Sequence, residues 1–224
     1  MIGKKAIRAM IVMAVSGVAL SGAGLAQAST VQPAGARDAH AAPAVAGASR
    51  LTPAPHPRAT APTPGFVRRA APNDTWSCYA PTGILSNANL QWVSAELAYW
   101  GDGYAMLRAR SSSIGGWEQF TFCDDVTANY WVFYNDANGD FVSTELGYTG
   151  DNTAMLRARA SSFGPWEEYS LYCTGSGATV IKSNANNDYV STELGYGGSS
   201  YAMLRARAAQ VGPWEQYSIP NVPC

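Results

Sequence analysis

Two kinds of side chain that can recognise a ligand recur at fixed spacing in this chain. The motif Met-Leu-Arg-Ala-Arg begins at Met106, Met155 and Met203 and supplies two arginines each time. A glycine-containing loop with a tyrosine comes shortly before each motif. A guanidinium is a planar fork that suits carboxylates and hydroxyl groups, and an aromatic ring offers a large amphipathic contact surface. The pattern therefore indicates binding of a ligand rather than attack on a bond.

The loops and the first arginine of each motif provide the candidate ligand-binding residues. A ring on a polar, glycine-containing loop is a natural platform for the apolar face of a sugar ring, and the arginine suits a ligand hydroxyl or carboxylate. The alternatives are tyrosines folded down over their hairpins and arginines paired with glutamates of the same copy. The candidates are Tyr99, Trp100, Tyr148 and Tyr196 from the loops, and Arg108, Arg157 and Arg205 from the motifs.

The residue types argue against an enzyme. Both histidines, His40 and His56, precede the repeated part of the chain, which excludes Ser-His-Asp and Cys-His schemes and the usual histidine-bearing zinc sites there. Glycoside hydrolysis needs two carboxylates in unlike environments, whereas the repeated ones lie in near-equivalent settings beside arginine. We expect no catalytic residue, no cofactor and no metal. The one calcium alternative is the acidic turn at Asp136, Asn138 and Asp140.

The repetition extends over the whole C-terminal part of the chain. Its three copies each contain a Gly-Gly-Trp-Glu or Gly-Pro-Trp-Glu turn, and the tryptophans Trp117, Trp166 and Trp214 are 49 and 48 residues apart. A fixed period of this size indicates repeated supersecondary units. Within each copy, short β-prone runs alternate with turn residues and no run has a sustained helical period. In the first copy we expect strands at 84–86, 92–97, 105–110 and from Trp117 onward.

Four strands in each of three copies predict an all-β fold, and specifically a β-trefoil. Three units are too few for an ordinary propeller, and closure of the sheet removes exposed strand edges. Strand alternation places Leu107 and Ala109 inward, so the arginines of the motif point outward or to a rim. The repeated tryptophans and the aromatic residue three positions after each are expected to form threefold layers of the core.

The N-terminal region predicts export. Basic residues and an apolar run precede the small-x-small site Ala26-Gln27-Ala28, which indicates a signal peptide over residues 1–28. Residues 29–72 are rich in alanine and proline and are expected to be a disordered linker. We expect a secreted, soluble protein without a membrane anchor. The folded domain is expected at 73–224, with repeats at about 76–123, 124–173 and 174–224.

All four cysteines lie in the predicted domain, at Cys78, Cys123, Cys173 and Cys224. An even number of cysteines in an exported protein indicates two structural disulfides rather than reactive thiols. Four cysteines allow three pairings. The sequence leaves all three pairings open.

The charge of residues 73–224 argues against polyanionic partners. This part holds seven basic and fifteen acidic residues, a formal charge of −8. Binding of nucleic acid normally needs clustered positive charge, and the same argument applies to actin. Six of the seven basic residues are the arginines of the repeated motif. We therefore expect no nucleic-acid partner, and we expect a monomer.

The repeats resemble a known family. The Asn/Asp-Ala-Asn turn, the Val-Ser-x-Glu run, Met-Leu-Arg-Ala-Arg and the Gly-Pro-Trp-Glu ending are together similar to the fascin-like (actin-crosslinking-like) β-trefoil repeat of bacterial secreted proteins. The likeness covers essentially all of residues 73–224. It implies a β-trefoil binding module. The Gln-x-Trp motif of ricin-type lectins is lacking, so their sugar-contacting residues are not carried over.

The resemblance leaves two kinds of partner. Eukaryotic fascins bundle actin, whereas bacterial relatives are often attached to secreted glycan-degrading enzymes, which implies polysaccharide binding. We expect a non-catalytic carbohydrate-binding module that uses up to three related loop sites, each weak, with avidity on a repeating polymer. The alternative is a protein-binding module, such as an inhibitor, an adhesin or an actin-binding-like protein. That alternative would use the unlike loops at 74–81 and 124–129.

Overall fold

The computed structural model describes residues 50–55 and 76–224. The predicted signal peptide and most of the predicted linker lie outside the described residues. Residues 50–55 differ from the prediction of a disordered linker, because they contain a short strand, β1 (Thr52–Pro53), that pairs with β10. The described part otherwise consists of strands, turns and single-turn 3-10 helices, so the all-β prediction is confirmed.

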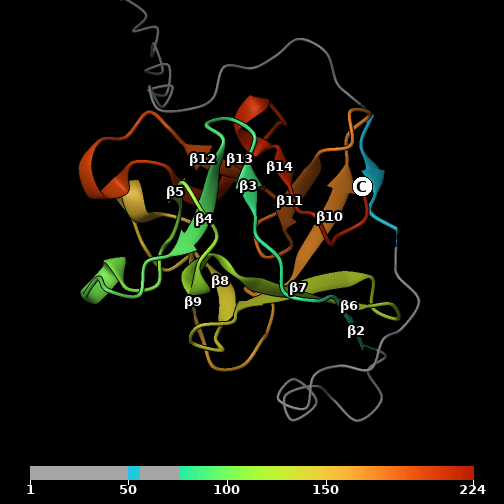
Figure 1. The fold of residues 1–224 in the computed structure, drawn as a ribbon, viewed down its shortest axis with the longest axis horizontal. Helices are drawn as coiled ribbons and strands as arrows, with labels where there is room; N and C mark the ends of the chain where they lie inside the picture. The colour runs from blue at the N-terminus through green and yellow to red at the C-terminus, as the bar shows by residue number, and fades with distance from the viewer. Residues whose placement is uncertain (1–49, 56–75) are drawn as a thin grey trace, which may run out of the picture. The chain divides into compact units, whose positions relative to one another are not determined.

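Six strands follow one another in a closed, barrel-like ring (Figure 1). Each strand hydrogen bonds to the next, and the bridge between Thr82 and Phe120 joins the chain just before β3 to β6. Closure leaves few exposed strand edges. The six strands are β3 (Leu85–Ser86), β6 (Phe120–Asp125), β7 (Tyr130–Asn135), β10 (Tyr169–Cys173), β11 (Thr179–Ser183) and β14 (Tyr217–Ser218).

Three hairpins, one per repeat, close one end of the ring. Their second strands meet around a pseudo-threefold axis through the bridges Met203–Arg108, Arg205–Met155 and Met106–Arg157. The hairpins are β4 (Gln91–Ala95) with β5 (Leu107–Ser111), β8 (Phe141–Glu145) with β9 (Met155–Ala160), and β12 (Tyr189–Glu193) with β13 (Met203–Ala208). A further strand, β2 (Trp76–Cys78), pairs with β6.

An asparagine in each repeat fixes the turn that leads into its hairpin. The Asn138 amide nitrogen donates to the carbonyl of Ala158 at 2.7 Å, and its amide oxygen accepts from the Asp140 backbone N–H at 3.1 Å. Asn89 and Asn186 make the equivalent pairs of bonds. The Asn138 side chain therefore serves the backbone, which accounts for the repeated Asn-Ala-Asn pattern by turn chemistry.

The core follows the threefold pattern of the sequence. Phe120, Tyr169 and Tyr217 are fully buried, one from each repeat. The predicted inward positions Leu107 and Ala109 are also fully buried, as the strand alternation predicts. The same holds for their counterparts Leu156, Ala158, Leu204 and Ala206.

The predicted placement of the repeated tryptophans in the core is wrong. Trp117 and Trp166 are 39% and 42% exposed, and Trp214 is half-buried. The reason is local, because the Trp-Glu step lies in a single 3-10 turn in two of the repeats and the strand starts only after it. These turns are η2 (Gly116–Glu118) and η5 (Pro213–Glu215). Only the aromatic residue three positions later reaches the core.

The structure selects one of the three cysteine pairings. Cys78 bonds to Cys123, which joins β2 to β6 within the first repeat. Cys173 bonds to Cys224, which ties the C-terminus to the end of β10. The described residues contain no free cysteine, so the prediction of two disulfides is confirmed.

Candidate functional site

The three tyrosine-bearing loops gather at the end of the ring that the hairpins close. Each loop contains a 3-10 turn, and the three turns lie on the left of Figure 1, in green, gold and orange-red, away from β1 and the C-terminus. The turns are η1 (Gly101–Gly103), η3 (Gly150–Asn152) and η4 (Gly198–Ser200).

The first arginine of each motif holds the loop of another repeat. In the second repeat, Arg157 Nε donates to the carbonyl of Tyr104 at 2.8 Å and its Nη2 donates to the carbonyl of Gly101 at 3.0 Å, both in the η1 loop. Its Nη1 donates to the hydroxyl of Tyr148 at 2.7 Å. The arginine therefore clamps the loop of the first repeat through the fork geometry of its guanidinium.

The same three contacts recur around the axis. Arg108 of the first repeat clamps the η4 loop of the third through the carbonyls of Tyr201 and Gly198. Arg205 of the third repeat clamps the η3 loop of the second through the carbonyls of Thr153 and Gly150. Each repeat thus holds its neighbour, and the three clamps form a closed cycle.

These arginines do not point outward or to a rim as the strand alternation predicts. Arg108, Arg157 and Arg205 are only 4%, 4% and 5% exposed. The strand face that carries them is covered by the neighbouring loop, and the buried methionines of the same face form a cluster at the axis, Met106, Met155 and Met203. Both faces of the motif are therefore buried as far as its first arginine, whereas the second arginine is exposed at Arg110 and Arg159.

Each candidate tyrosine contacts the first arginine of its own repeat through its hydroxyl. Tyr148 and Tyr196 pack against the cluster, and Arg157 and Arg205 lie over their rings at 5.9 and 5.8 Å from the ring centroids. The Tyr148 hydroxyl also donates to Asp102 of the η1 loop at 3.1 Å. The tyrosines are half-buried and hold the loops in place, so their geometry favours the alternative of rings folded down over the hairpins.

More exposed aromatic side chains lie on two of the three loops. Trp100 is 92% exposed, and Tyr104 and Tyr201 are 37% and 40% exposed. The second loop has Thr149 and Thr153 at the corresponding positions. Trp100 was among the predicted candidates, but Tyr104 and Tyr201 were not. Both follow the polar turn and directly precede a buried alanine. The recurrence of a tyrosine at this position in the first and third copies could have identified them.

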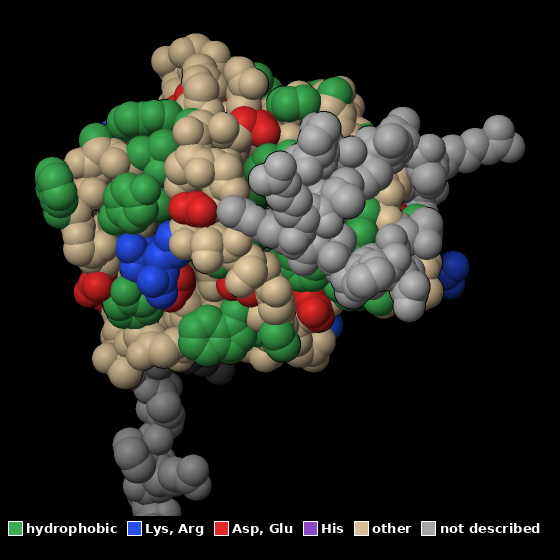
Figure 2. Space-filling model, turned by 90° about the horizontal axis from the view of Figure 1, so that it is seen from below, with side chains coloured by type: hydrophobic (Ala, Val, Ile, Leu, Met, Phe, Trp, Pro, Cys, Tyr) green, Lys and Arg blue, Asp and Glu red, His purple; other side chains and the backbone are tan. Residues whose placement is uncertain are grey.

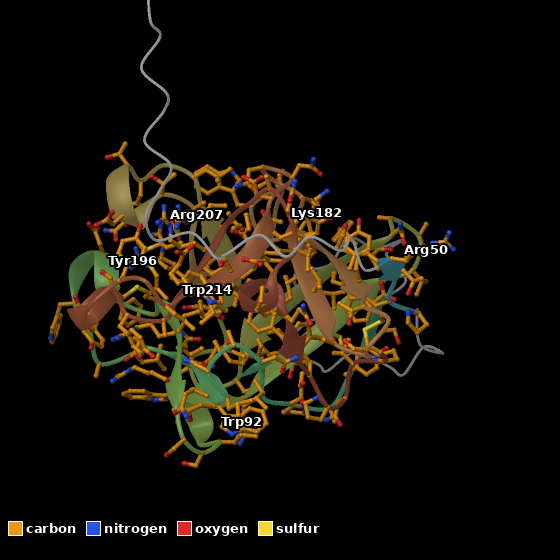
Figure 3. All side chains as sticks on the ribbon, turned by 90° about the horizontal axis from the view of Figure 1, so that it is seen from above. Arg50, Trp92, Lys182, Tyr196, Arg207 and Trp214 are labelled. Atoms are coloured by element: carbon orange, nitrogen blue, oxygen red, sulfur yellow. A yellow bond between two sulfur atoms is a disulfide. The ribbon has the colours of Figure 1, made fainter. Side chains whose placement is uncertain are left out.

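The second arginine of each motif forms the ion pair that the sequence analysis gave as an alternative. Arg110, Arg159 and Arg207 bind the buried carboxylates of Glu96, Glu145 and Glu193 through two nitrogens each. Hydrogen bonding to the glutamate raises the pKa of Arg110 and Arg159 above the ordinary value. Arg207 interacts electrostatically with Tyr196 of the third loop, and both are labelled in Figure 3.

The other repeated glutamate supports the backbone. Glu118, Glu167 and Glu215 are nearly buried and accept from the N–H of Gly115, Gly164 and Gly212 at 2.8, 2.7 and 2.6 Å. Burial raises the pKa of Glu167 and Glu215 above the usual glutamate value. Both sets of repeated carboxylates therefore have partners inside the protein.

The unlike loops of the protein-binding alternative lie beside each other. Residues 76–81 pair with β6 next to the turn at 124–129, with Trp76 opposite Asp125. Trp76, Asp124 and Asp125 are buried, so much of this region serves packing. Lys and Arg occupy only small areas of the face shown in Figure 2, among apolar, polar and acidic side chains. In the described part of the chain, no helix is long and apolar enough to cross a membrane.

Comparison with known proteins supports the fold but assigns no family. No family model and no curated protein matches the chain. Among solved structures, the designed threefold-symmetric protein ThreeFoil matches with a TM-score of 0.53 and 17% identity, covering 64% of this chain and 99% of that one. A Caenorhabditis elegans protein of unknown function matches with a TM-score of 0.54 and 11% identity, covering 68% and 99%.

Part of an exo-β-1,3-galactanase from Clostridium thermocellum is also similar. The match has a TM-score of 0.52 and 12% identity, and it covers 64% of this chain and 30% of the galactanase. At these identities the likeness concerns the fold alone. The chain has a β-trefoil-like fold, as its three repeats predict.

Proposed function

We propose that this protein is a secreted, non-catalytic module of the fascin-like kind that binds an uncharged polysaccharide through the loops at the hairpin end. The observation that carries the proposal is Trp100, an indole that is 92% exposed on a loop clamped by Arg157. An exposed aromatic side chain on a preorganised loop loses little entropy when a ligand stacks on it.

The exposed side chains of the loops support a neutral sugar as the class of ligand. Tyr104 flanks Trp100 on the same loop, and aromatic rings of this kind suit the apolar face of a neutral sugar ring. Arg157 is buried and donates to backbone carbonyls and a tyrosine hydroxyl. The more exposed Arg110 and Arg159 are paired with glutamates, whereas Asp102 and Asp151 are exposed. This arrangement disfavours an acidic glycan.

The lack of a catalytic role is supported by the repeated carboxylates. Each is tied to an arginine or to a glycine N–H, and this leaves no repeated pair of unlike, accessible acids as hydrolysis of a glycosidic bond requires. Two disulfides support an exported protein. The repeat motifs described above support the fascin-like assignment.

The test is retention of the full chain on insoluble cellulose, chitin, xylan and β-1,3-glucan, with competition by the matching soluble oligosaccharide. Trp100→Ala is expected to weaken retention about tenfold or more, as for a central tryptophan in a binding site. Trp117→Ala removes another partly exposed tryptophan, on η2 rather than the loops, and is the matched control. Retention by no glycan would move the proposal to a protein partner, and equal losses in both variants would exclude the loop as the site.

A further inference from the structure

Residues 50–55, here called the latch segment, occupy an open edge of β10. Thr52 lies opposite Cys173 and Pro53 opposite Tyr172, and the Ala54 N–H donates to the carbonyl of Leu171 at 2.9 Å. The neighbouring strand β7 pairs with β10 only at Trp131 and Tyr169. The far half of β10 therefore has a free edge, and the latch segment fills it.

The first repeat has the same arrangement at the equivalent residues. Ser77 lies opposite Asp124 and Cys78 opposite Cys123, and the Tyr79 N–H donates to the carbonyl of Phe122 at 2.9 Å. Phe122 and Leu171 both lie two residues after the core aromatic of their repeat. Thr52, Pro53 and Ala54 thus stand where the first repeat has Ser77, Cys78 and Tyr79.

The third repeat satisfies the equivalent carbonyl differently. Ile219 also lies two residues after its core aromatic, and its carbonyl accepts from the Val222 N–H at 3.0 Å within the C-terminal turn. All three repeats therefore need a donor at this carbonyl. Only the second repeat obtains this donor from a segment outside the three repeats, since Ala54 precedes the first of them.

The latch segment fills its place incompletely. Ala54 is buried, but it stands where the first repeat has a tyrosine that stacks on Trp131 at 5.6 Å between ring centroids. A cavity of about 50 Å³ remains between the segment, β7 and β10, lined in part by Ala54, Trp131 and Leu171. The side chains at Thr52, Pro53 and Pro55 are exposed. Within residues 50–55 and 76–224, the segment is held by its pairing with β10, by hydrogen bonds from Thr52 and Ala54 and by the burial of Ala54.

We propose that the edge of β10 is a strand acceptor and that the latch segment of a second copy of this chain replaces the chain's own. The donor sequence is present in every copy and its register already fits the acceptor. Twenty residues, 56–75, connect the donor to β2, so the local concentration of the chain's own segment is on the order of millimolar. The segment of a second chain competes with the chain's own segment for the edge, so the fraction of exchanged chains increases with protein concentration.

Reciprocal exchange between two chains forms a closed dimer with two copies of the hairpin-end loops. The latch segment lies at the opposite end from those loops, as the positions of Arg50 and Tyr196 in Figure 3 show, and the C-terminus lies beside β1 in Figure 1. Exchange at one end therefore leaves the loops of both chains exposed. The inference does not depend on the function proposed for the loops.

The native disulfide of the first repeat supplies the experiment. Pro53 and Tyr172 occupy the positions of Cys78 and Cys123, so cysteines at these positions have the geometry for a bond. One full-length chain carries Pro53→Cys and the other carries Tyr172→Cys. The two are mixed at rising concentration in a glutathione buffer, and heterodimers are counted on a non-reducing gel. A chain that carries both substitutions measures pairing within one copy.

Exchange predicts a disulfide-linked heterodimer that increases with concentration, falls when Ala54→Asp is added to the Pro53→Cys chain, and falls with a synthetic peptide of residues 47–58. The control replaces Pro53→Cys by Ser112→Cys, at an exposed position just after β5. Heterodimer no more abundant than with this control would overturn the proposal. So would a double variant that forms no internal bond, because the pairing of the segment with β10 would then be wrong.

Discussion

A pair of hydroxyl groups distinguishes the core of the second and third repeats from that of the first. Tyr169 and Thr144 lie 3.1 Å apart at their oxygens, and Tyr217 accepts from Thr192 at 3.2 Å. The first repeat has Phe120 and Ala95 at these positions. Each tyrosine hydroxyl also donates to a backbone carbonyl, that of Val142 or Val190, so the tyrosine links the buried threonine hydroxyl to the backbone of its hairpin.

This pairing predicts coupled effects on stability. Tyr169→Phe is expected to lower the free energy of unfolding by about 1 kcal/mol, because the hydroxyl of Thr144 loses its partner. Adding Thr144→Ala reproduces the pair of the first repeat, so the double variant should lose less than the two single losses combined, by about 0.5–1 kcal/mol. Urea unfolding of the four proteins measures this coupling. Additive losses would contradict the paired role.

A leucine occupies a left-handed backbone position in the first turn. Leu90 has φ 56° and is 69% exposed, whereas the equivalent residues of the other copies are Gly139 at 71° and Asn187 at 65°. A leucine side chain disfavours this conformation, whereas glycine and asparagine tolerate it.

Leu90→Asn is therefore expected to raise the free energy of unfolding by about 0.5–1 kcal/mol, because it relieves this strain without loss of buried surface. The measurement is the midpoint of chemical denaturation. The control is Ile114→Asn, which also removes an exposed apolar side chain but not at a positive φ. A gain of the same size in the control would mean that removal of an exposed apolar side chain, rather than relief of the left-handed backbone, causes the effect.

The elements are joined by clamps that pass from one repeat to the next. Arg157 belongs to β9, but its nitrogens hold the η1 loop of the preceding repeat. Lysine keeps the charge but has a single ammonium group without the fork. A substitution of Arg157, in the second repeat, is therefore expected to loosen the η1 loop of the first repeat.

Arg157→Lys is expected to cost about 2 kcal/mol of stability, because two carbonyls lose their donor. Hydrogen exchange is expected to accelerate at the amides of residues 101–106, and glycan retention to fall although Arg157 is buried. Arg159→Lys, two residues away on the same strand, is the matched control and should leave exchange in these residues unchanged. Unchanged exchange in both variants would show that the clamp does not hold the loop.

At the scale of the whole molecule, two disulfides close loops of similar length. Cys78–Cys123 spans 45 residues and Cys173–Cys224 spans 51. In the chain-entropy description, the stabilisation depends mainly on that length. The two bonds are therefore expected to contribute nearly equally, although one lies within a repeat and the other ties down the C-terminus.

Replacing both members of either pair by alanine is expected to lower the free energy of unfolding by about 4 kcal/mol. The midpoints of thermal and chemical unfolding for the two variants measure the losses. The comparison also shows whether the second disulfide supports β10, because Cys173 is the last residue of that strand. A markedly larger loss without Cys173–Cys224 would mean that this bond also maintains the edge that the latch segment occupies.

Features that depend on residues close together in the chain could be predicted from the sequence. Turn residues, alternating apolar positions and a repeat of nearly constant length predict short strands, three equivalent units and their core positions, such as Leu107 and Ala109. The pairing of Arg110 with Glu96 was also predictable as an alternative, because both residues belong to one hairpin. The number of disulfides follows from the even number of cysteines together with the predicted export.

Which side chains are covered by distant parts of the chain could be seen only in the folded structure. Arg157 is buried because a loop about 50 residues earlier lies over it, and Trp117 is exposed because a 3-10 turn lifts it off the strand. The latch segment pairs with β10 across a separation of 121 residues between Thr52 and Cys173. Burial and hydrogen-bond partners of this kind arise from contacts between repeats, which local periodicity does not encode.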